Sequence, residues 1–599
     1  MRRGRVASLL PAGGCSAGHR RGPDIDDLFD PFTVEIVKEK LAAAAAEMGV
    51  VRARTSMSPI VYEVLDFACG LTDAKAQVVA QTNGLTLFTG TFGPQVQSIL
   101  RKHGRDGMRD GDVFATNIPY EGGTHTCDVC LVKPILASGR VIAFAVSVTH
   151  WIDIGGAVPG SISPVATEIY QEGLQLPGVR IVEQGRRNQT LIDVIEANIR
   201  VPRTGIGDLN AGLAATAIGE ARVREACERY GVDLVLASFG RILDHGEQVA
   251  RGELRRIPSG VYRATGVIDG DGVTDDEIAI EVAVTLGDGL LHADFTGCAP
   301  QTRGPVNCST GALLSACKTV VRAITAPQAR SNDGFFRPFS LTVPPRTVFS
   351  AEAPAPTGWY YEGAAFANDL LWKALAPVVP KRLGAGSYLS LCASYVVGTD
   401  QTGELFVLGE PNVGGWGGSE LGDGASALIA TTDGDTYNFP VEVVESRYPV
   451  LVERYALNVE AGGGAGRHRG GFGVVRRYRI HGARGAAAYG SVGGFGRVPW
   501  ALSGGLAGTP NFLEYTTPEV RIRRGRVPRV ELTDGAVVSS VTGTGGGFGD
   551  PLEREPERVR EDVLDGYVTS EDARACYGVA VDPLSLELDR AETARLRAR

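Results

Sequence analysis

Glycine is the residue that most constrains how this chain can fold. Its 79 occurrences among 599 residues amount to about 13%, nearly twice the ~7% of an average protein. Many of them gather after residue 400, in GGWGG (414–418), GGGAGRHRGGFG (462–473) and GTGGGFGD (543–550). Because glycine accepts backbone conformations and close approaches that other residues do not, these clusters predict hairpin turns and backbone packing in a β-rich region.

The rest of the composition is typical of a large globular protein. Apolar residues make up 43% of the chain and charged residues 22%, which excludes intrinsic disorder, collagen and coiled coil. At roughly 100–200 residues per domain, the length predicts three to five structural units.

Apolar periodicity predicts where the regular elements lie. A 3.6-residue period predicts a first helix over 33–49, with Thr33 as its N-cap and Gly49 as its end. Strict alternation predicts a β-hairpin within 260–297, with its turn at 287–289. Further helices are expected at 206–256, at 309–325 and after 552, where Thr569 and Gly578 frame one helix.

The net charge of -9 is unevenly distributed along the chain. Residues 1–22 contain five arginines and no acidic residue, so the remainder is five charges more negative than the total. An acidic body argues against a nucleic-acid-binding surface. The longest apolar stretch after residue 22, at 141–148, is far shorter than the ~20 residues that span a bilayer, so we expect no membrane span.

Several catalytic signatures are missing, and the cysteines carry little signal. The sequence contains no phosphate-binding GxxxxGK[ST] loop, no GxSxG elbow and no HExxH zinc motif. Ten cysteines without a framework spacing indicate a reducing compartment, so we expect a cytoplasmic protein. Cys127 and Cys130 form a single CxxC, which we interpret as a pair of buried thiols.

Two histidines stand in similar settings, each followed three residues later by an aspartate. His125 and Asp128 lie in NIPYEGGTHTCDVC, while His150 ends the apolar stretch VIAFAVSVTH and precedes Asp153. Two imidazoles and a carboxylate on a turn and a strand end suit a mononuclear manganese, iron or zinc site. The alternative is that each histidine is a buried core residue bonded to its local aspartate.

These patterns together predict an α+β protein with a large, multi-layer mixed fold. Its N-terminal half carries the metal site, and its C-terminal half is rich in β-structure and glycine. The predicted division is a disordered basic tail at 1–24, an α/β metal-site region at 25–257, a hairpin and helical region at 258–400, a glycine-rich β region at 401–550 and a helical tail at 551–599.

Six passages carry a family resemblance, and they run in family order over about residues 30–580. They are VLDFACGLTDAKAQVVAQ, GDVFATNIPYEGGTHTCD, HWIDIGGAVPGS, EIYQEGLQLPGVRI, DFTGCAPQTRGPVN and the ending that begins GGGFGDPLEREPERVRED. With these passages the chain resembles the B-type component of the hydantoinase/oxoprolinase family, which includes caprolactamase and acetone carboxylase subunits. Many relatives carry a histidine-containing stretch after VVAQ, where this chain reads TNGLTLFTG.

The resemblance implies a set of metal ligands. The histidine and aspartate of the GGxHxxD motif map to His125 and Asp128, and the histidine that opens HxxDxGG maps to His150. The aspartate of the DFxC motif, here Asp66, is implied as a further carboxylate ligand. Asp153 is then expected to orient a ligand or the Gly155–Gly156 turn.

The resemblance also implies a partner and a reaction. In the family, ATP binding belongs to a separate A-type, actin-like ATPase, which phosphorylates the amide before the B-type component acts. Water activated by a divalent metal then opens the cyclic amide, with Asp153 or Glu172 as candidate bases. A hetero-oligomer such as A2B2 is expected. Two alternatives stay open: a component of an ATP-dependent ketone carboxylase, and a non-catalytic scaffold whose metal stabilises the fold.

Overall fold

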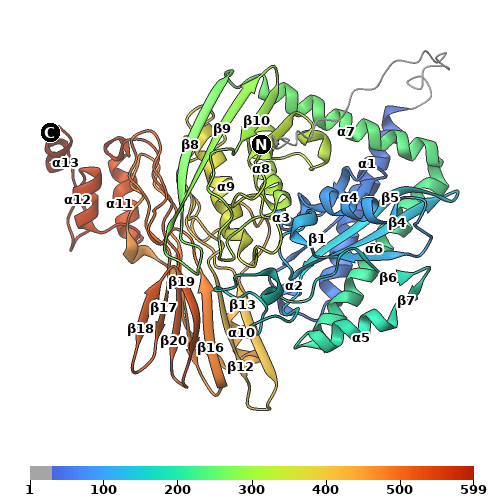
Figure 1. The fold of residues 1–599 in the computed structure, drawn as a ribbon. Helices are drawn as coiled ribbons and strands as arrows, with labels where there is room; N and C mark the ends of the chain where they lie inside the picture. The colour runs from blue at the N-terminus through green and yellow to red at the C-terminus, as the bar shows by residue number, and fades with distance from the viewer. Residues whose placement is uncertain (1–29, 599) are drawn as a thin grey trace, which may run out of the picture.

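The computed structural model describes residues 30–598, and its N-terminal half is built on a seven-stranded sheet (Figure 1). All neighbouring strands are antiparallel, in the order β2-β1-β5-β4-β3-β6-β7. Their bounds are β1 Phe67–Asp73, β2 Val78–Gln81, β3 Val113–Thr116, β4 Asp128–Ala137, β5 Arg140–His150, β6 Val179–Glu183 and β7 Arg186–Arg187. Helices α1 (Pro31–Thr55) and α6 (Pro202–Tyr230) pack together and against this sheet. Helix α4 (Phe92–His103) covers its other face, where Gly70 approaches Phe92.

The first predicted helix is present, but both of its predicted ends were wrong. Helix α1 runs over Pro31–Thr55, and its N-cap is Asp30, whose side chain accepts from the backbone N–H of Phe32. Gly49 lies inside the helix, where an added Cβ atom would stand 2.9 Å from Cγ2 of Thr82. Glycine is therefore needed at position 49 for close packing, which the sequence pattern does not distinguish from a helix end.

The middle of the chain confirms the predicted hairpin and helices. A four-stranded sheet has the order β11-β10-β9-β8, and the β9–β10 turn falls at the predicted position. The elements are β8 Gly260–Asp269, β9 Glu277–Gly287, β10 Leu290–Asp294, β11 Phe339–Thr342, α6 Pro202–Tyr230, α7 Val232–Leu254, α8 Thr310–Thr325 and α9 Tyr360–Leu375. Helix α9 packs on β8 and β9, and α8 packs on α9.

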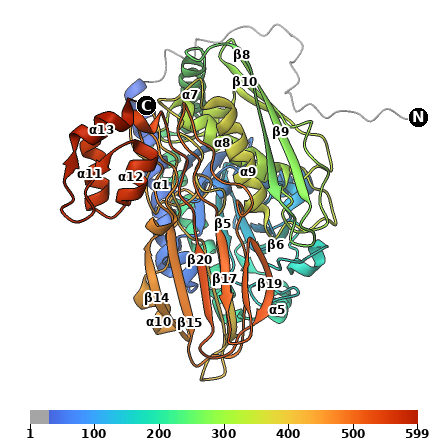
Figure 2. The ribbon, with the colours of Figure 1, turned by 90° about the vertical axis from the view of Figure 1, so that its left-hand side faces the viewer.

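Two further sheets form the β-rich half predicted after residue 400 (Figure 2). One has the order β13-β12-β16-β19 and the other β14-β15-β20-β17-β18. Their strands are β12 Ala393–Thr399, β13 Leu405–Glu410, β14 Val450–Leu457, β15 Val474–Ile480, β16 Arg484–Ser491, β17 Phe512–Thr516, β18 Arg521–Arg524, β19 Arg526–Glu531 and β20 Val537–Val541.

The glycine clusters lie between these strands and pack against one another. Gly415 donates its N–H to the carbonyl of Gly543, and Gly545 donates to the carbonyl of Gly471. An added Cβ atom at Gly415 would lie 2.0 Å from the Gly471 oxygen, and one at Gly545 would lie 2.2 Å from the Trp416 oxygen. The three clusters are thus layers of backbone in contact, held by hydrogen bonds between distant segments, and only some of their glycines make turns.

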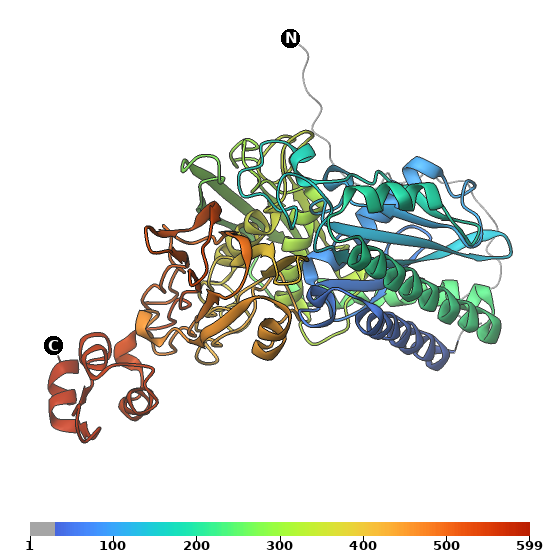
Figure 3. The ribbon, with the colours of Figure 1, turned by 90° about the horizontal axis from the view of Figure 1, so that it is seen from below.

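Helices at the end of the chain form a small unit that projects from the rest (Figure 3). It contains α11 Pro556–Leu564, α12 Ser570–Tyr577, α13 Arg590–Arg597 and the short strands β21 Ala580–Val581 and β22 Leu588–Asp589. Thr569 is the N-cap of α12 and Gly578 its left-handed C-cap, as predicted. Arg554 connects the unit to the glycine-rich region, because its guanidinium binds both Asp562 and Asp423.

The fold is α+β, as predicted, and one hydrophobic core cluster reaches from Ala68 to Tyr489. The remaining helices are α2 Pro59–Tyr62, α3 Thr86–Thr89, α5 Gln189–Asn198 and α10 Val441–Arg447. Among the helices of residues 30–598, none combines the length and the apolar character needed to cross a membrane. The predicted tail at 1–24 lies outside the described residues, and the division at 257, 400 and 550 stays a prediction.

Candidate metal centre

The strand register brings three of the predicted site residues to one edge of the N-terminal sheet. Asp128, the first residue of β4, pairs with His150, the last residue of β5. Phe67, the first residue of β1, pairs with Thr149, so Asp66 comes to lie beside His150. The backbone N–H of His150 donates to the Asp66 carbonyl at 3.2 Å, which extends this pairing by one residue.

His125 joins them from the turn that precedes β4. Its Nε2 lies 2.9 Å from Oδ1 of Asp128 and 3.2 Å from Nδ1 of His150, and His150 Nδ1 lies 3.0 Å from the same Asp128 oxygen. Atoms bound to one ion at 2.0–2.2 Å stand roughly 3 Å apart. All three side chains are buried. Among the described residues, only these three form a group able to hold a metal ion by this spacing.

Neighbouring groups orient the donor atoms of this cluster. Nδ1 of His125 lies 2.9 Å from the carbonyl oxygen of Gly358, so Nδ1 carries the proton and the lone pair of Nε2 faces the cluster. The hydroxyl of Thr124 donates to Oδ2 of Asp128 at 2.6 Å, which leaves Oδ1 facing the imidazoles. This arrangement fits a divalent cation, because two neutral nitrogens and one carboxylate oxygen already converge.

The charges in the cluster favour an ionised Asp128. Burial raises the pKa of this carboxyl, but His125 and His150 together have a larger and opposite effect. The net result is a pKa well below its usual range. For His125, burial lowers the pKa while Asp128 raises it, and the net shift is upward. A carboxylate held as an anion against two imidazoles is the state that binds a cation.

Asp66 lies beside the cluster but outside its 4.8 Å spacing. Burial raises the pKa of its carboxyl to about 6. Its Oδ1 atom is buried and has no hydrogen-bond partner among the described residues. The side chain faces a small cavity that Asp433 also lines.

Asp153 uses both carboxylate oxygens to hold a loop. Oδ1 accepts from the N–H groups of Gly155 and Arg200, each at 2.9 Å. Oδ2 accepts from the Gly160 N–H at 2.9 Å and from the Arg200 guanidinium at 3.0 Å. These four donors fix the turn at Gly155–Gly156 against the start of α6.

Glu172 is buried and reaches the metal centre through a backbone group. Its Oε2 accepts from the N–H of Thr357 at 3.0 Å, and its Oε1 accepts from the N–H of Gly358 at 2.7 Å. The Gly358 carbonyl is the one that His125 contacts. Burial raises the pKa of Glu172 to about 7. Glu172 therefore holds the peptide that orients a candidate ligand.

Sequence reasoning missed the residues that come from the second half of the chain. Tyr360 packs against His125, with ring centroids 4.9 Å apart and an edge-on geometry. Gly358 and Asp433 carry no motif that marks them in the sequence.

Cys127 and Cys130 are both buried with free thiols, as expected.

Comparison with known proteins identifies the family of this chain. A family model described as hydantoinase B/oxoprolinase matches residues 30–551. The chain belongs to the hydantoinase B/oxoprolinase family. This confirms the family resemblance that the six sequence passages indicate.

Individual relatives match this family member over nearly their whole length. A protein of Pseudomonas sp. (strain NS671), named as the B-type component of a D-/L-hydantoinase, is 33% identical, over 95% of this chain and 98% of its own. The beta chain of the caprolactamase of Pseudomonas jessenii is 30% identical, over 95% and 99% respectively.

Two solved structures share the fold of this hydantoinase B family member. The ATP-dependent caprolactamase of Pseudomonas jessenii superposes with a TM-score of 0.89 at 28% identity, covering 95% of this chain and 100% of that one. A nucleotide-free acetone carboxylase chain has a TM-score of 0.88 at 20% identity, covering 95% of this chain and 82% of that one. The second likeness is one of fold.

Proposed function

We propose that this chain is the B-type component of an ATP-dependent cyclic-amide hydrolase of the hydantoinase, 5-oxoprolinase or lactamase type. The observation that carries the proposal is the convergence of His125, Asp128 and His150 within about 3 Å of one another in a buried site. The names of its relatives, which refer to a hydantoinase and a caprolactamase, supply the substrate class.

In this proposal His125, Asp128 and His150 hold a divalent cation of zinc, manganese or iron, and Asp66 adds a carboxylate beside them. Such a cation supplies Lewis acidity, which polarises a carbonyl and lowers the pKa of water. The chain itself sets the direction of the donor atoms: Gly358 fixes the tautomer of His125, and Thr124 fixes the carboxylate plane of Asp128.

The contacts of Asp153 and Glu172 favour positioning roles over the role of base that the sequence suggested. Asp153 has four hydrogen-bond donors on its two oxygens, and Glu172 has a backbone donor on each oxygen. The four donors occupy the lone pairs of Asp153, and the two donors to Glu172 are the N–H groups of the Thr357–Gly358 segment that orients His125, so each carboxylate holds backbone in place. We assign Asp153 to the Gly155–Gly156 loop and Glu172 to the Gly358 peptide.

The partner in this proposal is a hydantoinase A-type ATPase, in a hetero-oligomer such as A2B2. The hydantoinase and caprolactamase relatives are each named as one component of a larger enzyme. The sequence lacks a phosphate-binding loop motif, which is consistent with ATP bound by the partner. The nine described cysteines are free thiols, which fits the reducing cytoplasm.

Reconstitution tests the proposal. The chain is co-expressed with a hydantoinase A-type ATPase, and ATP-dependent turnover is measured on a hydantoin, 5-oxoproline and caprolactam. Ring opening coupled to ATP hydrolysis is the expected result. Turnover of acetone with bicarbonate, but of none of the three rings, would instead establish the ketone carboxylase alternative.

The variant His150→Ala separates catalysis from scaffolding. We expect it to bind the ATPase but to lose bound metal and ATP-coupled ring opening, because one of three converging donors is removed. A folded complex that lacks metal and keeps full turnover would leave the chain as a non-catalytic scaffold.

A further inference from the structure

A second group of oxygen atoms faces the small cavity beside Asp66. The cavity holds about 30 Å³ of free volume, and Asp433 and Thr436 are among its lining residues. Oδ1 of Asp66, Oδ2 of Asp433 and Oγ1 of Thr436 are all buried without a hydrogen-bond partner in the described part of the chain. Asp433 is 1% exposed and Thr436 5%. Burying polar atoms without partners is costly, so three of them at one cavity point to a bound species.

The fold holds Asp433 and Thr436 at this place through backbone contacts with the N-terminal half. They lie in the segment between β13 and α10, where Tyr437 donates its N–H to the Val64 carbonyl at 3.0 Å. The Thr432 carbonyl accepts from the N–H of Leu87 at 3.2 Å. These contacts bring the segment against residues on both sides of β1, directly beside Asp66.

The described residues that line the cavity supply anionic oxygens and no basic side chain. Glu410 also lines it, but that carboxylate is occupied by the Arg476 guanidinium at 2.7 Å. A cation placed between Asp66 and Asp433 would satisfy the orphaned oxygens of both carboxylates and of Thr436.

We propose that Asp66, Asp433 and Thr436 bind a second divalent cation, Mg²⁺ or Mn²⁺, next to the His125–Asp128–His150 centre. Two carboxylates and a hydroxyl are hard oxygen donors, which these ions prefer over the nitrogen-rich sites typical of zinc. The free volume is sufficient for one ion and about one water molecule. The assignment concerns metal binding alone, so it stands or falls independently of the reaction proposed above.

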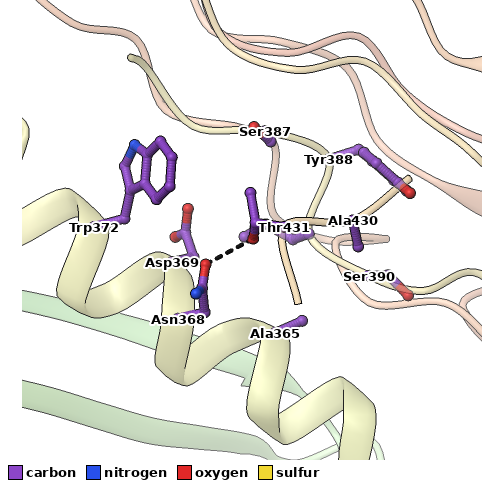
Figure 4. A pocket seen from close by; sticks show the side chains of 10 residues that line it. Ala365, Asn368, Asp369, Trp372, Ser387, Tyr388, Ser390, Ala430 and Thr431 are labelled. Carbon is purple, nitrogen blue, oxygen red and sulfur yellow. Dashed lines mark hydrogen bonds between the residues drawn. The ribbon is translucent and has the colours of Figure 1, made fainter. Parts of the chain in front are cut away.

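A second cavity provides a matched comparison (Figure 4). It is lined by Asn368, Asp369 and Thr431 among others, and its acidic side chain is that of Asp369. There the polar atoms are paired: Trp500 Nε1 lies 2.9 and 3.1 Å from the two Asp369 oxygens, and Thr431 donates to Asn368 at 2.7 Å. Asp369 thus lines a cavity that does not include Asp66, and its substitution can serve as a control.

Metal counting on the full chain tests the proposal. Chelator-treated protein is titrated with Mn²⁺, bound metal is counted by mass spectrometry, and the spectrum of the bound ions is recorded by electron paramagnetic resonance. We expect two Mn²⁺ per chain in the wild type, with a spectrum showing coupling between the ions. Asp433→Asn should bind one Mn²⁺ fewer, while the control Asp369→Asn should still bind two.

Either of two results would overturn the second site: a wild-type chain that saturates at one Mn²⁺, or Asp433→Asn protein that retains both ions. If Asp433→Asn fails to fold, as judged by circular dichroism, the wild-type titration and the variant Thr436→Val replace it. Thr436→Val is expected to lower the affinity for only one of the two Mn²⁺ ions. Failure of the cyclic-amide proposal would appear as absent turnover with an unchanged metal count.

Discussion

His125 is oriented by Gly358, a residue that stands 233 positions further along the chain. The imidazole Nδ1 and the glycine carbonyl oxygen lie 2.9 Å apart. The same peptide unit is held from the other side, because the N–H of Gly358 donates to Glu172 at 2.7 Å. The direction of a candidate metal ligand thus depends on a peptide that belongs to neither of the two histidine motifs.

The first prediction concerns Glu172. An amide at this position can accept from only one of the two N–H groups of Thr357 and Gly358, and its own NH₂ would face the other. We expect Glu172→Gln to weaken metal affinity by roughly 10–100-fold, the usual effect of losing a group that orients a ligand. Competition with a chromophoric chelator measures the affinity.

The control for this prediction is Glu196→Gln, an exposed glutamate on α5, which should leave the affinity unchanged. A change confined to thermal stability, with normal metal affinity in the Glu172→Gln protein, would contradict the positioning role. Glu172→Asp serves as the conservative variant, and partial recovery of affinity is expected.

The second prediction concerns Asp153 and the loop that it holds. Asparagine would place an NH₂ group against backbone N–H donors and would leave the Arg200 guanidinium without its anion. Asp153 is fully buried but the Arg200 side chain is partly exposed, so the cost lies below that of breaking a fully buried pair, about 3–5 kcal/mol. We expect Asp153→Asn to lower the free energy of unfolding by roughly 2–4 kcal/mol, measured by urea denaturation. An unchanged denaturation midpoint would refute this, and the exposed Asp193→Asn is the control.

The third prediction concerns the packed glycine clusters. A Cβ atom on Gly545 would stand 2.2 Å from the backbone oxygen of Trp416, which cannot move without disturbing the neighbouring layer. We expect Gly545→Ala to abolish folding or to lower the melting temperature sharply. Gly240→Ala on α7, with no atom within 4 Å of the added group, should be neutral or stabilising by up to about 1 kcal/mol. Equal melting temperatures for the two variants would contradict the packing argument.

The fourth prediction is a pH dependence arising from Asp369. Burial raises the pKa of this carboxyl from 3.8 to about 7, so the folded protein takes up a proton that the unfolded chain does not. The free energy of unfolding therefore falls as pH rises from about 4 to about 7. Above pH 7 the buried group is ionised and its full cost is felt.

Asp369→Asn removes this titration while keeping an acceptor for Trp500. We expect the variant to match the wild type near pH 4 and to exceed it at pH 8. The Asp369 side chain is partly exposed and lines a cavity, so solvent there reduces the difference to roughly 1–2 kcal/mol. Urea denaturation at both pH values provides the measurement, and a gain of equal size at the two would rule out the titration.

Some features of this protein were determined by the sequence on its own. The 3.6-residue period of α6, α7 and α8 and the alternation of β9 and β10 are local, because each element contains the apolar stripe that it buries. The caps of α12 are local as well. The two histidine–aspartate motifs already contained the three converging donors, since a turn and two paired strand ends bring them together.

Other features were decided only by the tertiary structure. The end of α1 depends on what Gly49 packs against, and Thr82 lies on a separate segment. The contacts of Glu172 come from residues 357 and 358, and the cavity that Asp66 lines is completed by Asp433 from a distant segment. Likewise, the sequence of a glycine cluster does not show whether its glycines form turns or pack closely against another segment. Which polar group meets which depends on contacts between segments hundreds of residues apart, and no local periodicity records them.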